Sequence, residues 1–417
     1  MAARDDFYRI KRLPPYVFAE VNRLKAEARQ AGVDVIDFGM GNPDMDTPGH
    51  IVEKMIETVS RPRTHRYSAS KGIAGLRRAQ AAYYERRFGV SLDPDREVIA
   101  TLGSKEGLAN LAMAITAPGD VILAPNPSYP IHPYGFMIAG GALRHIPALN
   151  AEGRFDPEEY MRALARAVRH SVPTPIALVV NFPSNPTAQL CDADFYAELV
   201  AFARAHGVYI LSDLAYAEIY FDDVAPPPSI LEAPGARDVA VEFTSLSKTY
   251  SMPGWRMGFA VGAERLISAL TRIKSYLDYG AFTPIQVAAA AALNGPQDCV
   301  AEIRAAYRGR RDALVEAMGR AGWTIPSPPA TMFAWAPLPP AFAELGSMSF
   351  AKILLAEAEV AVSPGVGFGE YGEGYVRIGL VENEQRVRQA ARNVKRLLAD
   401  PGPAIERHLA REAARPA

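Results

Sequence analysis

An alternation of short apolar segments with helix-like segments, running from about residue 47 to residue 298, constrains the fold of this chain most. The apolar segments are rich in branched side chains and cover residues 98–101, 121–124, 176–181, 208–212, 240–244 and 257–261. Helical patterning occupies residues 104–116, 157–169, 192–206 and 263–277 between them. Strands and helices that alternate in this way form a mostly parallel sheet with helices on both faces. The predicted fold class is therefore α/β.

The two ends of the chain follow a different pattern. After Cys299 a long charged helix precedes apolar segments near residues 332–335, 360–363 and 376–380, which indicates a smaller α+β unit. The first 45 residues contain an amphipathic helix and a short strand, too few to fold alone, so we place them against that unit. We predict a large domain over residues 46–298 and a small domain formed by residues 1–45 plus 299–417. We expect residues 401–417 to be loosely held.

Composition and charge exclude several classes of partner. The 45 basic and 46 acidic residues leave a net charge of -1, which gives no basic surface for nucleic acid or an anionic membrane. The apolar runs fall well short of the ~18 residues that a membrane span needs. Two cysteines, Cys191 and Cys299, provide neither a disulfide framework nor a CxxC metal site, so no metal is expected. Without a visible signal peptide at the N-terminus, we expect a cytoplasmic protein.

Polar residues that follow the predicted strands are the candidates for chemistry, because ligands of open α/β sheets collect beyond the carboxyl ends of the strands. Ser104 and Lys105 follow the strand at 98–101 in a glycine-rich turn, which either binds a phosphate at a helix N-terminus or is an ordinary capped turn. Asp213 and Tyr216 follow another strand, where an acid either faces a ligand or caps a helix. Lys248 follows a third strand in an apolar setting that would lower its pKa for nucleophilic chemistry, unless the loop is solvated.

Two arginines are also candidates for binding a ligand. Arg256 begins an apolar segment, and Arg377 lies inside the last one, where an unpaired guanidinium would be costly. Each needs an anionic partner, which is either an internal carboxylate or a bound carboxylate or phosphate. These residues together indicate a small anionic ligand and lysine chemistry.

The set of motifs resembles the class I/II pyridoxal-phosphate aminotransferases of fold type I. The motifs occur in the order of that family, from about residue 10 to residue 400. They are Gly39-Met40-Gly41-Asn42-Pro43-Asp44, Ser104-Lys105-Glu106-Gly107, Asn185-Pro186-Thr187, Asp213 to Tyr216, Ser245 to Lys248, Gly254-Trp255-Arg256-Met257-Gly258 and Val376-Arg377-Ile378.

The resemblance implies a role for each site residue toward pyridoxal 5'-phosphate. Lys248 would form a Schiff base with the cofactor and later move the substrate proton, and Asp213 would keep the pyridine nitrogen protonated. Asn185 and Tyr216 would hydrogen-bond the phenolic oxygen of the cofactor, and Tyr129 would stack on its ring. The phosphate would be held by Ser104, the Lys105 backbone, Ser245, Arg256 and Tyr67 of the neighbouring subunit.

The resemblance also implies substrates and an assembly. Arg377 would bind the α-carboxylate of an amino acid or 2-oxo acid, assisted by Asn185 and the Gly41 backbone, with Tyr16 near the mouth of the site. Because Tyr67 would reach the active site of the neighbouring subunit, the resemblance implies a homodimer with shared active sites.

A narrower resemblance is to the bacterial alanine (glutamate-pyruvate) aminotransferases. The motifs that carry it are Leu13-Pro14-Pro15-Tyr16-Val17-Phe18, Asn126-Pro127-Ser128-Tyr129-Pro130 and Tyr276-Leu277-Asp278-Tyr279-Gly280. They imply ping-pong exchange between L-alanine and 2-oxoglutarate. The alternatives are transamination of LL-diaminopimelate, aspartate, methionine or an aromatic amino acid, a carbon-sulfur lyase, and a non-catalytic regulatory module that binds the cofactor.

Overall fold

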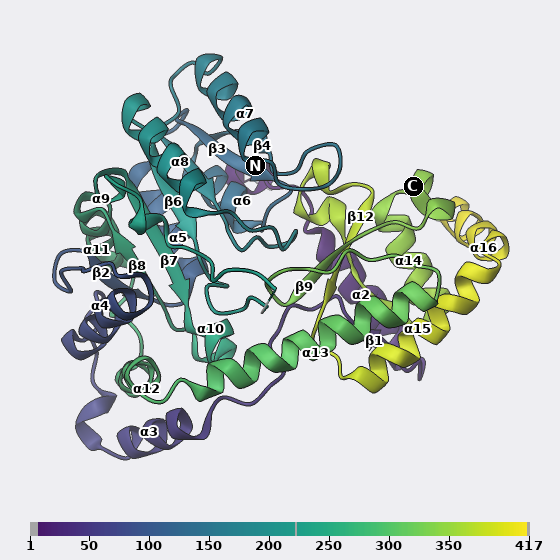
Figure 1. Cartoon of the computed structure of the whole chain (residues 1–417), viewed down its shortest axis with the longest axis horizontal. Coiled ribbons are helices and arrows are strands. Elements are labelled where there is room, and N and C mark those ends of the chain that lie inside the picture. Colours follow the sequence, from purple (N-terminus) through teal and green to yellow (C-terminus); the bar gives the residue numbers. More distant parts are fainter. Residues whose placement is uncertain (1–6, 222, 415–417) are drawn as a thin grey trace, which may run out of the picture.

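A mixed, mostly parallel sheet forms the centre of the larger part of the molecule (Figure 1). The computed structural model describes residues 7–221 and 223–414. The strand order is β2-β8-β7-β6-β5-β3-β4, and β8 runs antiparallel to both of its neighbours. The strands are β2 (Val98–Thr101), β3 (Val121–Asn126), β4 (Ala142–Pro147), β5 (Ala177–Val180), β6 (Tyr209–Asp213), β7 (Ala240–Ser245) and β8 (Gly258–Gly262).

Helices cover both faces of this sheet because alternate strand residues are apolar on both sides. In β5, Leu178 and Val180 face one apolar core while Ala177 and Val179 face another. The first core is completed by α4 (Ala74–Phe88), α7 (Pro157–Arg169), α8 (Ala193–His206) and α12 (Thr283–Asn294). The second is completed by α5 (Ser104–Ile115), α6 (Ile131–Ala139) and α11 (Glu264–Leu277). The predicted α/β sheet with helices on both faces is confirmed.

The smaller unit is built on an antiparallel sheet of order β11-β12-β9. Its strands are β9 (Phe333–Pro337), β11 (Ser363–Pro364) and β12 (Tyr375–Gly379). Its helices are α13 (Asp298–Arg320), α14 (Gly346–Ala358), α15 (Glu384–Ala399) and α16 (Gly402–Ala413). The long helix α13 runs from the large unit to the small one (Figure 1), with Val300 in the first core and Ile303 in the core of the small unit.

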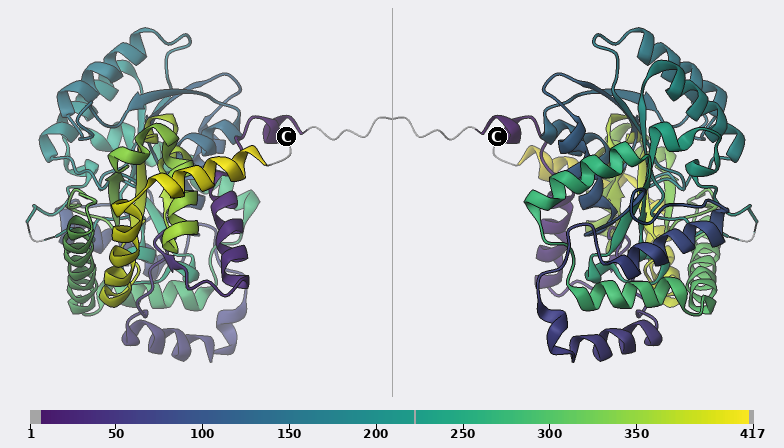
Figure 2. Two further views of the ribbon diagram at one scale, coloured as in Figure 1. Left: turned by 90° about the vertical axis from the view of Figure 1, so that its right-hand side faces the viewer. Right: turned by 90° about the vertical axis from the view of Figure 1, so that its left-hand side faces the viewer.

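The N-terminal segment lies on this smaller unit, as expected from its length. The strand β1 (Ile36–Asp37) pairs in parallel with β10 (Val360–Ala361), and α2 (Val17–Gln30) packs against α14. Figure 2 shows the purple α2 beside the yellow-green C-terminal helices. The domain boundaries at residues 46 and 298 stay a prediction.

Short helices complete the chain. They are α1 (Tyr8–Lys11), α3 (Gly49–Val59), α9 (Ala236–Val239) and α10 (Leu246–Thr249), with 3-10 turns at Pro62–His65, Ile230–Glu232, Pro253–Trp255, Pro340–Leu345, Gly365–Phe368 and Glu370–Gly372. The expectation of a loose C-terminal end is wrong for α16, which buries Ala404 and His408, while residues 415–417 lie outside the described part. Within the described ranges, the helices are all too short or too polar to cross a membrane.

Candidate active site

A cavity of about 430 Å³ lies where the carboxyl ends of β2, β6 and β7 face the small sheet and the segment around Gly41. Short loops follow these strands, so the residues that the sequence analysis selected at separate strand ends come together. All of the predicted site residues except Tyr67 line the cavity. They are Tyr16, Gly41, Ser104, Lys105, Tyr129, Asn185, Asp213, Tyr216, Ser245, Lys248, Arg256 and Arg377.

Lys248 is carried by the short helix α10, directly after β7. Its Nζ donates a hydrogen bond to the Gly41 carbonyl oxygen at 3.0 Å, and no carboxylate in the described part of the chain pairs with it. Burial, followed by the nearby charges of Arg377 and Arg256, lowers the pKa of Lys248 to about 8. A lysine with a pKa this close to neutrality supplies a useful fraction of free amine, so it can act as a nucleophile and as a base.

Asp213 ends β6 with its carboxylate at the cavity and only 6% of its surface exposed. Its Oδ2 lies 2.9 Å from Nε2 of the fully buried His132, and its Oδ1 accepts a hydrogen bond from the Ala215 N–H at 3.2 Å. His132, on α6, was missed by the sequence analysis. The available signal was a histidine in an otherwise apolar segment, just beyond the motif 126–130.

Two asparagines in the bend after β5 join the site residues to one another. The Asn181 side chain donates to the Asp213 carbonyl oxygen at 2.7 Å and accepts from the Asn185 N–H at 2.8 Å. The Asn185 side chain in turn accepts a hydrogen bond from Arg377 at 2.8 Å. The sequence analysis selected Asn185 through the motif Asn185-Pro186-Thr187, which does not include Asn181.

Arg377 projects from β12 between two aromatic rings. Its guanidinium carbon lies 4.0 Å from the centre of the Phe333 ring and 4.7 Å from that of Phe368. Burial lowers the pKa of Arg377 to about 10, and its Nε has no hydrogen-bond partner. No carboxylate among the described residues pairs with Arg377. The internal salt bridge, which the sequence pattern left open as an alternative, is therefore not found among these residues. A buried guanidinium with free donors suits a carboxylate ligand.

The N-terminus of α5 forms a cradle with Arg256. Gly103 has a φ of +88°, and a Cβ on it would lie 2.3 Å from an Arg256 guanidinium nitrogen. Arg256 donates to the carbonyl oxygens of Pro253 at 2.9 Å and Leu102 at 3.2 Å, which holds its side chain beside that helix end. Free N–H groups at a helix N-terminus, Ser104 and a guanidinium together make a site for a phosphate. Ser245, which caps α10, lines the same cavity.

Tyrosines line the remaining sides. Tyr216 is buried, and its ring centre lies 6.0 Å from Lys248 Nζ. Burial raises the pKa of Tyr216, so its hydroxyl stays protonated and can donate a hydrogen bond. Burial also raises the pKa of Tyr129, whose ring centre lies 5.7 Å from Lys105 Nζ. Tyr16 is largely exposed where the N-terminal segment borders the cavity.

Tyr67 does not belong to the cavity formed by its own chain. Its side chain is 87% exposed, and its ring centre lies 4.7 Å from that of Tyr279. Tyr276, close by in sequence, is 85% exposed. A contribution of Tyr67 to a neighbouring subunit's site stays a prediction.

Comparison with known proteins agrees with this geometry. The family model for aminotransferase class I and II matches residues 33–394, and the chain belongs to that family. The putative aminotransferase AatC of Rhizobium meliloti is 65% identical, with 95% of this chain and 96% of AatC covered. The glutamate-pyruvate aminotransferase AlaC of Escherichia coli is 51% identical over 97% of each chain. An LL-diaminopimelate aminotransferase of Moorella thermoacetica is 42% identical, covering 94% and 97%.

A solved structure gives the same result for the fold. Substrate-bound BacF of Bacillus subtilis superposes with a TM-score of 0.85 at 35% identity, covering 93% of this chain and 96% of that one. The protein is thus a fold type I aminotransferase. Its family uses pyridoxal 5'-phosphate as cofactor.

The residues of the cavity fit this cofactor. The space opposite the Gly103 Cα is occupied by the Arg256 guanidinium, which leaves a cationic cradle of the kind that a phosphate needs. Lys248 offers an amine and Asp213 a buried carboxylate to the same cavity. The cofactor, when bound, supplies an aldehyde that accepts the amino group and a ring that takes up electrons from the substrate Cα.

Proposed function

We propose that the enzyme transfers the amino group between L-alanine and 2-oxoglutarate, giving pyruvate and L-glutamate in a ping-pong reaction. The observation that carries this proposal is the apolar surrounding of Arg377, which lies between Phe333 and Phe368. Among the described residues, the arginines that line the cavity are Arg256, at the α5 cradle, and Arg377. A substrate held by Arg377 therefore meets no second guanidinium for a short side-chain carboxylate.

The size and charge of the substrate side chain decide which amino acids fit beside Phe333 and Phe368. A methyl group is buried without cost, whereas the carboxylate of aspartate would be desolvated beside apolar rings. Lys25 also lines the cavity, but it is already paired with Asp37 at 3.0 Å. The longer side chain of glutamate can extend to the mouth of the cavity, where Tyr16 is 65% exposed and water solvates the carboxylate. AlaC, at 51% identity over nearly the whole chain, supports the same substrate pair.

In this proposal each site residue has a defined action. Arg377 and Asn185 bind the α-carboxylate and so fix the orientation of the substrate Cα. Lys248 Nζ removes the Cα proton and returns it, which its lowered pKa favours. Asp213, oriented by His132, holds a proton on the pyridine nitrogen of the cofactor.

We also propose that two copies form a dimer with shared sites. The aromatic side chains of Tyr67, Tyr276 and Tyr279 lie exposed on neighbouring segments of the surface. Exposed aromatic groups of this kind are enriched at protein interfaces. A second copy that covers them would also bring Tyr67 to the phosphate cradle of its partner.

Specificity constants for alanine, glutamate, aspartate, methionine and LL-diaminopimelate test the proposed substrate. We expect alanine and glutamate to rank above the others. A higher rank of aspartate or LL-diaminopimelate would overturn the substrate while leaving the class of enzyme intact. Release of ammonia and pyruvate without a 2-oxo acid would instead indicate a lyase, and failure of every amino acid to change the cofactor absorbance would indicate a binding module.

A further inference from the structure

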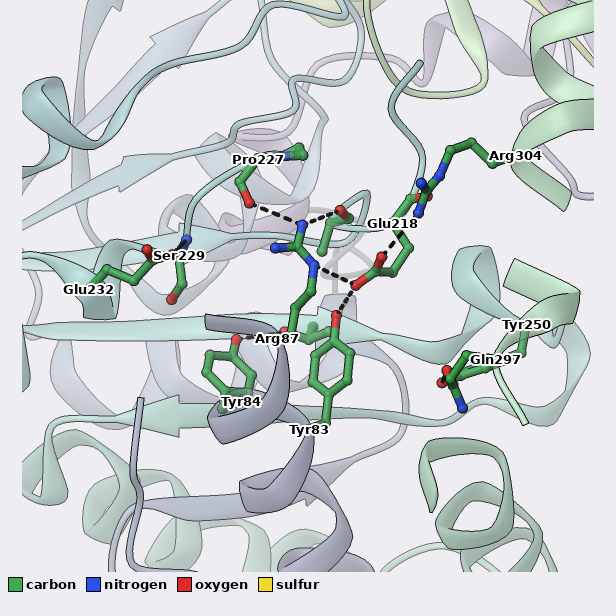
Figure 3. Close-up of polar contacts among 12 residues, drawn as sticks. Tyr83, Tyr84, Arg87, Glu218, Pro227, Ser229, Glu232, Tyr250, Gln297 and Arg304 are labelled. Carbon is green, nitrogen blue, oxygen red and sulfur yellow. Dashed lines mark hydrogen bonds and ion pairs between the residues drawn. The ribbon is translucent and has the colours of Figure 1, made fainter. Parts of the chain in front are cut away.

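Glu218 lies two residues beyond Tyr216, and only 7% of its surface is exposed. Its Oε1 accepts hydrogen bonds from the Tyr83 hydroxyl at 2.7 Å and from Arg87 Nε at 3.1 Å (Figure 3). Its Oε2 lies 3.4 Å from a guanidinium nitrogen of Arg304. Burial and the adjacent carboxylate raise the pKa of Tyr83, so this hydroxyl remains a donor. A buried carboxylate with charged donors on both oxygens is held firmly in place.

The same arginines also bind the backbone of this segment. Arg87 donates to the carbonyl oxygens of Ala217 at 3.4 Å and Pro227 at 3.3 Å, and Arg304 donates to that of Glu218 at 3.2 Å. The Arg304 guanidinium carbon lies 3.9 Å from the centre of the Tyr220 ring. The chain directly after Tyr216 is therefore fixed through both its side chains and its main chain.

Glu218 connects elements of both units. Tyr83 and Arg87 belong to α4 of the large unit, whereas Arg304 follows the point where α13 enters the core of the small unit. Beyond Glu218 the segment pairs with the small unit, where Thr331 N–H donates to the Ile219 carbonyl oxygen at 2.7 Å. The ring of Tyr216 is thus held between two anchors, β6 on one side and the Glu218 cluster on the other.

Glu218 itself is not among the residues that line the cavity. Glu218 therefore makes no direct contact with a bound ligand, and Tyr216 is the nearest cavity residue along the chain. We propose that Glu218 is a positioning residue that fixes the Tyr216 hydroxyl toward the phenolic oxygen of the cofactor. This inference rests on the proposed contact between Tyr216 and that oxygen.

A pH titration of the cofactor absorbance distinguishes a positioning role of Glu218 from a direct effect of its charge, because the two effects move the midpoint in opposite directions. A hydrogen bond donated to the phenolic oxygen stabilises its anionic form. Loss of that bond therefore raises the pH at which the bound cofactor loses its proton, which is measured as the midpoint of its absorbance change. Loss of a nearby negative charge acts oppositely and lowers the midpoint. The titratable and charged groups to consider around Glu218 and Tyr216 are Tyr83, Arg87, Tyr129, Asp213, Lys248, Tyr250, Arg304, Tyr307 and Arg377.

The test is an absorbance titration of the holoenzyme with a double-mutant cycle. Tyr216→Phe should raise the midpoint by roughly one to two pH units, and Glu218→Gln by about one unit or less in the same direction. The midpoint of the double variant should not rise above that of Tyr216→Phe alone, because Glu218 raises it only through Tyr216. Glu232→Gln is the charge control: Glu232 is exposed, binds only the Ser229 N–H in the described part, and should leave the midpoint unchanged.

Each result decides the proposal. A midpoint that is unchanged or lowered in Glu218→Gln, or shifts that add in the double variant, would overturn the positioning role while leaving that of Tyr216 intact. An unchanged midpoint in Tyr216→Phe would instead remove the proposed Tyr216 contact and this inference with it. If circular dichroism shows that Glu218→Gln does not fold, Arg304→Lys keeps both charges, removes the guanidinium that binds the Glu218 side chain and main chain, and must raise the midpoint; no shift in folded Arg304→Lys would overturn the proposal.

Discussion

Lys248 combines a buried position with an amine that would be charged in water. Burial lowers its pKa to about 8 from the ordinary 10.5, and a positive charge without a carboxylate partner is costly to bury. Burial of the Lys248 amine therefore lowers the stability of the protein while it raises the reactivity of the amine.

This cost has a measurable pH dependence. Between pH 8 and 10.5 the unfolded chain binds more protons at Lys248 than the folded one, so the stability of the cofactor-free protein rises with pH across that window. Lys248→Met should raise the free energy of unfolding at pH 7 by up to about 3 kcal/mol, with a gain that disappears toward pH 10.5. Denaturant unfolding at several pH values measures this. Lys395→Met, at an exposed site on α15, is the control, and an identical pH profile in both variants would contradict the account.

In the proposed reaction Asp213 acts through its charge, so an isosteric amide separates its chemistry from its packing. Asp213→Asn should fold normally and lose turnover by several orders of magnitude, because a neutral side chain no longer favours a protonated pyridine nitrogen. Steady-state kinetics beside thermal unfolding check this. Asp194→Asn, on the exposed first turn of α8, should behave like the parent enzyme. Wild-type turnover in Asp213→Asn would refute the proposed role.

At the scale of elements, the phosphate cradle depends on a helix end that has no room for a side chain. A Cβ on Gly103 would collide with Arg256, while Gly119 has a similar φ of +91° with nothing within 4 Å. Both Gly→Ala variants should lose about 1–3 kcal/mol of stability from backbone strain. Only Gly103→Ala should also bind the cofactor more weakly, as measured by fluorescence titration of the cofactor-free protein. Equal affinities in the two variants would argue against the cradle.

The strands were predictable wherever both faces of the sheet are covered, because such strands are continuous apolar runs. β5 and β7 are examples, with every residue buried. β4 was missed since it lies at the sheet edge and carries Arg144 and His145 among its residues. α12 was missed because its alanine-rich sequence has no marked polar face.

The part of the site that lies at the strand ends was predictable, because the topology of the sheet alone brings these residues together. Polar residues after parallel strands meet at one edge, which brought Lys248, Asp213 and Ser104 to the same cavity. His132 and Asn181 act through other residues, so their importance depends on contacts that no local pattern encodes. The predicted role of Tyr67 depends on a second chain, which no pattern around residue 67 encodes.

At the scale of the whole molecule, the cavity lies between two units joined by α13 and by the segment that follows Tyr216. Residues from both units bind the same ligand in the proposed reaction, Arg377 from β12 of the small unit and Lys248 from α10 of the large unit. A change in the relative position of the units would therefore change the distance between the carboxylate-binding and amine-bearing groups.

The proposed dimer makes a prediction about mixed subunits. Tyr67→Ala and Lys248→Ala subunits should each be nearly inactive alone. A hybrid of the two contains one site with both residues intact, so mixing should restore part of the activity. Differently tagged subunits allow the hybrid to be purified and assayed. A purified hybrid with no recovered activity would refute the sharing of sites through Tyr67.

Borohydride reduction of the holoenzyme followed by peptide mapping tests most directly whether Lys248 carries the cofactor. We predict that the cofactor becomes fixed to Lys248 in the absence of substrate. Prior exposure to L-alanine should abolish this label, because the amino group passes to the cofactor and frees the lysine, and 2-oxoglutarate added afterwards should restore it. A label on another lysine, or a label on Lys248 that L-alanine leaves unchanged, would contradict the account.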